Sequence, residues 1–141
     1  MNREELKKIM PHREPMLLLD EASHIDDVHG TGSYTVRGDE FFLQGHYPGN
    51  PIVPGVILCE MMAQCACSVL GQKLADGTPY FTGLDKVRIR NKVVPNDTFV
   101  IKVALANQKG TFYFIDCEGH VNGKLCISGS FSFAVVPNRH V

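Results

Sequence analysis

The chain has 141 residues, of which 44% are hydrophobic and 21% charged, and its formal net charge is −1. This length predicts one domain over 1–141, with little room for a second module. The near-neutral charge gives no indication of a nucleic-acid partner, and no apolar run is long enough to cross a bilayer. The N-terminal segment MNREELKKIM lacks the apolar stretch of a secretory signal, so we expect a cytoplasmic protein that does not associate with membranes.

The first half of the chain predicts short elements followed by a loop. Residues 2–10 predict an amphipathic helix that ends before Pro11. The segments Met16–Asp20 and Gly32–Arg37 predict two strands. Residues 44–55 contain three prolines and three glycines, which is typical of a structured loop.

The second half predicts one helix and a run of strands. Val56–Leu74 is apolar nearly all round, which indicates a long buried helix. Asn122-Gly123 predicts a type I′ hairpin turn. β-Branched and aromatic residues predict strands over 80–90, 98–106, 111–121 and 124–136. This order favours an α+β fold in which a curled antiparallel sheet surrounds the helix, with a free edge that a dimer would cover.

The five cysteines do not indicate a disulfide framework or a metal site. Their number is odd and their spacing irregular. Cys59, Cys65 and Cys67 fall in the predicted helix, where the last two would point about 200° apart. We interpret them as small buried side chains in a reducing compartment.

Two side chains stand out between Phe41 and Gln72, because His46 and Glu60 are the only acidic, basic or imidazole groups there. A carboxylate in a buried helix is costly unless it is paired or protonated. Glu60 could also face solvent or form a hydrogen bond that serves only the fold. Gln64 follows at i+4 and could orient the carboxyl group. His46, on a loop stiffened by glycine and proline, is either a rigidly held base or a structural histidine.

Gly55 begins the predicted helix, where backbone N–H groups lack partners within the helix. A glycine there would let a ligand approach the backbone, although a turn glycine after Pro54 is the simpler interpretation. A base, an acid and a backbone N–H donor together suit proton abstraction next to a carbonyl group.

The run from Phe42 to Gln64, FLQGHYPGNPIVPGVILCEMMAQ, closely resembles the signature of FabZ-type (3R)-hydroxyacyl-[acyl-carrier-protein] dehydratases. Further matches are Met10-Pro-His-Arg, Leu17-Leu-Leu-Asp, Phe81-Thr-Gly-Leu-Asp-Lys and Val93-Val-Pro-Asn-Asp. The resemblance implies a hot-dog fold, in which a long helix is wrapped by an antiparallel sheet. It also implies a homodimer, which in some members assembles into a trimer of dimers, with the histidine and the acid of each site on different protomers.

The resemblance further implies dehydration of (3R)-3-hydroxyacyl chains on acyl carrier protein to trans-2-enoyl chains in fatty acid biosynthesis. His46 would be the base, Glu60 the acid and Gly55 the backbone donor to the thioester carbonyl, with no metal or organic cofactor. Tyr80 would lie near the mouth of the acyl tunnel. Glutamate at position 60 is typical of dehydratases without isomerase activity, although some members with glutamate also isomerise, and the acyl chain length stays open.

Four cations, Lys86, Arg88, Arg90 and Lys92, alternate along a predicted strand and would share one face. We interpret this row as the docking surface for the acidic carrier protein, with a solvated strand face as the alternative. Two other functions are weighed against the dehydratase: a hot-dog acyl thioesterase and a non-catalytic acyl-binding module.

Overall fold

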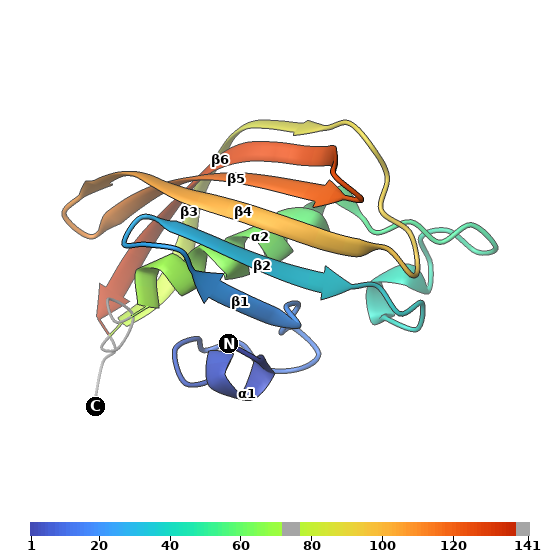
Figure 1. Ribbon diagram of the computed structural model, residues 1–141, viewed down its shortest axis with the longest axis horizontal. Coiled ribbons are helices and arrows are strands. Elements are labelled where there is room, and N and C mark those ends of the chain that lie inside the picture. Colours follow the sequence, from blue (N-terminus) through green and yellow to red (C-terminus); the bar gives the residue numbers. More distant parts are fainter. Residues whose placement is uncertain (72–76, 138–141) are drawn as a thin grey trace.

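The structure is a computed structural model that describes residues 1–71 and 77–137. In chain order its elements are α1 (Arg3–Leu6), β1 (Glu21–His24), β2 (His29–Thr35), the 3-10 helix η1 (Phe41–Leu43), α2 (Gly55–Leu70), β3 (Gly77–Ile89), β4 (Thr98–Lys109), β5 (Phe112–Val121) and β6 (Lys124–Pro137). Figure 1 shows the sheet curving around α2, with α1 beside β1 and the loop after η1 projecting from the far end of the domain. The predicted helix inside a curled antiparallel sheet is confirmed.

The six strands form an antiparallel sheet in the order β1-β2-β4-β5-β6-β3. Its two edges differ. β1 has four residues, and an isolated bridge between Asn2 and Glu21 covers part of it. β3 has 13 residues and carries exposed apolar side chains, namely Tyr80, Phe81, Leu84 and Ile89. A long apolar edge strand is a surface on which another strand can pair.

Helix α2 lies against the concave face of the sheet because both surfaces are apolar there. Residues from Leu58 to Leu70 are buried, with Glu60 as the half-buried exception. The helix approaches β2 closely at two glycines. A Cβ atom on Gly30 would lie 2.9 Å from Val69, and one on Gly32 would lie 2.9 Å from Cys65 Sγ. A small side chain at position 65 therefore suits this contact, and all five cysteines are free and buried as expected.

The predicted strand Met16–Asp20 is wrong, because these residues are irregular and the first strand is β1. Leu17, Leu18 and Leu19 are buried. A side chain of α2 bonds the middle of this segment, since Gln64 accepts from Leu18 N (2.8 Å) and donates to Met16 O (2.7 Å), while Asp20 N at its end donates to β2, at Ser33 O (2.8 Å).

Other boundaries need smaller corrections. The N-terminal helix is a single turn, α1, and α2 begins at Gly55 and ends at Leu70, while predicted helix residues 72–74 lie outside the described residues. The four C-terminal strands are present. The Asn122-Gly123 turn has φ angles of +50° and +78°, as a type I′ turn requires. In the described part of the chain, no helix has the length and apolar character to span a membrane.

Candidate active site

The loop that carries His46 is closed by reciprocal backbone hydrogen bonds. Tyr47 N donates to Asn50 O (3.2 Å), and Asn50 N donates back to Tyr47 O (2.9 Å). Gly49 lies between them with φ +74°, a conformation that favours glycine. The loop projects from the domain (Figure 1), yet its own turn fixes the backbone around His46.

Ile52 orients the His46 ring. Ile52 N donates to His46 O (2.8 Å), and the Ile52 carbonyl oxygen lies 2.8 Å from His46 Nδ1. A carbonyl can only accept, so Nδ1 carries the proton of the neutral ring and Nε2 presents a lone pair. The Tyr47 ring stacks on the imidazole at a centroid distance of 4.1 Å. His46 therefore has the tautomer that a general base needs.

Gly55 is the first residue of α2 and borders the same cavity as His46, with a volume of about 300 Å³. A Cβ atom on Gly55 would collide with Cδ1 of Ile89, which also lines this cavity. The absence of a side chain at Gly55 therefore allows close packing against Ile89. The Gly55 backbone borders the cavity at the N-terminal end of α2, where N–H groups have no partner within the helix.

Glu60 lies on the buried helix with its side chain 26% exposed. Gln64 Nε2 donates to Glu60 Oε2 over 3.0 Å, as the i, i+4 spacing predicts. Gln64 itself is fully buried. The carboxyl group is thus held on one side by the helix and open to a cavity on the other.

His46 and Glu60 line different cavities of the single chain. The cavity beside Glu60 measures about 110 Å³ and is lined by His12, Glu60, Ala63, Cys67, Pro79, Phe81 and Phe133. Among the described residues, none lines both this cavity and that of His46. One chain alone therefore gives the base and the acid separate cavities.

The four cations predicted to share one strand face do not share it. Lys86 has φ +54°, and the pairing of β3 with β6 shifts between Asp85 and Arg88. β3 then ends at Ile89, before the last two cations. An alternating row needs an uninterrupted strand, and the irregularity and the early end both prevent it. The prediction of a single face is wrong.

Arg90 and Lys92 instead border the His46 cavity, beyond the end of β3. Asn91, between them, donates its side-chain amide to Leu125 O (2.7 Å), which holds the segment against β6. Both cationic side chains are exposed. Positive charge therefore lies next to His46.

Phe81 is an aromatic residue of β3 that the structure brings to the Glu60 cavity. Its ring stacks on Phe133 at a centroid distance of 4.9 Å. Pro79 and Phe81 line the cavity, and Tyr80 between them, 56% exposed, points to the other face of the strand. The place of Tyr80 at a tunnel mouth stays a prediction.

Sequence reasoning missed His12, which the structure places beside Glu60. His12 Nε2 lies 3.7 Å from Glu60 Oε2. The two residues are 48 positions apart, so no local spacing relates them. The only signal in the sequence was the position of His12 within the Met10-Pro-His-Arg run.

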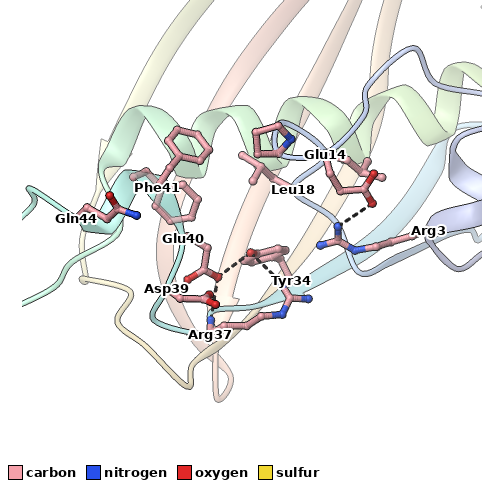
Figure 2. Close-up of a pocket in the computed structure, with 12 residues that line it drawn as sticks. Arg3, Glu14, Leu18, Tyr34, Arg37, Asp39, Glu40, Phe41 and Gln44 are labelled. Carbon is pink, nitrogen blue, oxygen red and sulfur yellow. Dashed lines mark hydrogen bonds and ion pairs between the residues drawn. The ribbon is translucent and has the colours of Figure 1, made fainter.

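Another cavity, of about 320 Å³, lies beside the N-terminal segment, and ion pairs and hydrogen bonds connect residues that line it (Figure 2). Arg3 pairs with Glu14 (3.3 Å) and with Asp20 (3.2 Å). Tyr34 donates to Glu40 (2.7 Å) and accepts from Arg37 (3.0 Å).

Each charged group in these contacts already has an oppositely charged or polar partner, so the network fixes chain segments to one another. It holds residues 14–20 in place, next to the segment that carries His12.

Comparisons with known proteins identify the family of this chain. A family model for the FabA-like domain matches residues 10–130. The 3-hydroxyacyl-[acyl-carrier-protein] dehydratase FabZ of Clostridium perfringens is 38% identical over 137 residues, covering 96% of this chain and 99% of that protein. The protein of the same name from Streptococcus pyogenes serotype M3 is 33% identical and covers 95% of this chain and 98% of its own length.

Among solved structures, the dehydratase heterocomplex ApeI:P from Xenorhabdus doucetiae superposes with a TM-score of 0.81 at 24% identity, covering 95% of this chain and 91% of that one. The architecture and the family match define a FabA-like domain with the hot-dog fold, as the sequence predicted. Within that class, the chain belongs to the family of FabZ 3-hydroxyacyl-[acyl-carrier-protein] dehydratases.

Proposed function

We propose that this protein is a hydro-lyase of fatty acid biosynthesis, acting as one domain over residues 1–141. It removes water from a (3R)-3-hydroxyacyl chain on acyl carrier protein and forms the trans-2-enoyl chain. The observation that carries the proposal is the family match over nearly the whole chain together with His46, whose ring is held with Nε2 free.

In this reaction His46 Nε2 takes a proton from C2 of the acyl chain. Ile52 supports that role, because its carbonyl accepts from Nδ1 and stabilises the imidazolium that forms. The electron pair left at C2 moves into the thioester carbonyl, and the Gly55 N–H at the start of α2 stabilises the oxygen that becomes negative.

The electron pair then forms the C2–C3 double bond as the hydroxyl group leaves C3. Glu60 donates the proton that converts this hydroxyl group into water. Gln64 supports the role by holding the carboxyl group at a fixed place on the helix. The site needs no cofactor in this scheme, since a base, an acid and a backbone donor complete the proton transfers.

The active form in this proposal is a homodimer built along β3. The exposed apolar side chains of this edge strand would be covered by a second copy. The separate cavities of His46 and Glu60 support a shared site, because a partner can bring its Glu60 to the His46 of the first chain. Three such dimers would then assemble into a trimer of dimers, as the family resemblance implies for some members.

The partner that delivers the substrate is acyl carrier protein. Arg90 and Lys92 beside the His46 cavity, with Arg88 and Lys86 on β3, would attract an acidic carrier and the phosphate of its prosthetic arm. The five free cysteines suit a reducing compartment such as the cytoplasm.

Incubation of the protein with (3R)-hydroxyacyl carrier protein, followed by mass spectrometry, tests the reaction. Loss of one water with the thioester intact supports the dehydratase, whereas release of a free acid would support a thioesterase, and an unchanged substrate a binding module. His46→Ala and Glu60→Gln should each lower turnover by about 10²-fold or more. His29→Ala is the matched control, since His29 is an exposed histidine paired with Asp26.

A further inference from the structure

The orientation of the Gln64 amide group is fixed independently of Glu60. Its oxygen accepts from Leu18 N, which can only donate, and its nitrogen donates to Met16 O, which can only accept. The remaining proton of Nε2 therefore points to Glu60 Oε2, at 3.0 Å. Oε2 acts as an acceptor whatever the protonation state of the carboxyl group.

His12 approaches the same oxygen from the N-terminal segment. Its Nε2 lies 3.7 Å from Glu60 Oε2, and its Nδ1 is buried without a hydrogen-bond partner among the described residues. An unpaired buried N–H costs more than an unpaired lone pair on a ring nitrogen, so the proton belongs on Nε2. Burial lowers the pKa of His12 below its ordinary value, although the charge of Glu60 acts in the opposite direction. The ring is therefore neutral at pH 7.

A role in packing alone does not account for a histidine at this place. An apolar side chain of similar volume would fill the space without leaving Nδ1 unpaired, and such a replacement is close to neutral for stability. The functional atom of the His12 ring is therefore Nε2, which faces the carboxyl group of Glu60. Contacts of this kind are often longer without substrate than in the reacting complex.

We infer that His12 is a positioning residue that, together with Gln64, makes Oε2 of Glu60 an acceptor and so places the acidic proton on Oε1. When Oε1 gives its proton to the leaving hydroxyl group, the carboxylate that remains accepts from both N–H groups. The two donors thus leave Oε1 as the oxygen that reacts, and they stabilise the negative charge of the carboxylate through their contacts with Oε2. This inference rests on the proposed function, because it assumes that Glu60 is the acid.

The first test compares His12→Leu, which removes the donor, with His12→Gln, whose amide nitrogen can take the place of Nε2. His12→Leu should lower kcat for hydroxyacyl carrier protein roughly tenfold while KM stays within about twofold, since the residue acts on the carboxyl group and not on substrate binding. His12→Gln should recover most of the loss. His29→Leu, on the exposed histidine at the start of β2, should leave both parameters unchanged. If His12→Leu does not fold, His12→Phe removes the donor while keeping a ring.

The second test is a double-mutant cycle that a purely structural role would not reproduce. In a Glu60→Gln background, His12→Leu should have no further effect on kcat, because its partner is already gone. An equal loss in both backgrounds, or a loss in His12→Gln as large as in His12→Leu, would overturn the inference. Full turnover by Glu60→Gln alone would instead reject Glu60 as the acid, so the two failures are distinct.

Discussion

Mixing two inactive variants tests whether the active site is shared between protomers. His46→Ala and Glu60→Gln each remove one of the two groups, and the groups line cavities with no residue in common in a single described chain. In a dimer with shared sites, each variant alone has two damaged sites. A mixed dimer has one site that lacks both groups and one site that is intact.

The expected recovery follows from counting. If subunits exchange freely at equal concentrations, half of the dimers are mixed and one of their two sites works, so activity should reach about a quarter of the wild-type value. Recovery should be greatest at a 1:1 ratio and should fall toward either pure variant.

The assay is the rate of enoyl thioester formation after the variants have been incubated together. Native mass spectrometry of subunits with different tags reports the fraction of mixed dimers in the same samples, and circular dichroism checks that both variants fold. If mixed dimers form and the activity stays at the sum of the two parents, each site lies within one protomer, and the reasoning from separate cavities is refuted.

Three further predictions concern other parts of the molecule. Arg88→Glu with Arg90→Glu should raise KM for carrier-bound substrate about tenfold and leave a short pantetheine substrate unaffected, as steady-state kinetics at low salt would show. Gly119→Ala should destabilise the protein by about 1–3 kcal/mol in urea unfolding, because a Cβ atom there would collide with the buried ring of Phe99. Burial lowers the pKa of His12 in the folded state, so stability should be complete above pH 6.5 and decline as the pH falls below it, and His12→Gln should flatten this dependence of the melting temperature.

Local patterns in the sequence predicted much of this fold. The strands of the C-terminal half and their Asn122-Gly123 turn depend on alternation and turn chemistry within a few residues. Helix α2 was predictable because its apolar surface is nearly continuous. The hydrogen bond between Glu60 and Gln64 follows from helical spacing alone.

The errors have a common physical cause, which is that the deciding contacts are distant or depend on backbone conformation. The leucines at positions 17–19 are as apolar as the residues of a buried strand, but the Gln64 side chain, 46 positions away, accepts the hydrogen bond of Leu18 N. The contact of His12 with Glu60 likewise joins residues that lie 48 positions apart in the sequence. The positive φ of Lys86 ends the alternation of the basic row, and nothing in a lysine side chain indicates such a conformation.

The sheet order has a consequence for the synthesis of the protein. β3 pairs within the sheet with β6, the last strand among the described residues, so it has no partner strand in the sheet until β6 has been made. Phe133, which closes the Glu60 cavity, also lies on that last strand. The edge that would receive a second subunit and the wall of the acid cavity are therefore completed in the same late step. A chain that stops before β6 consequently has neither a defined edge for assembly nor an enclosed cavity.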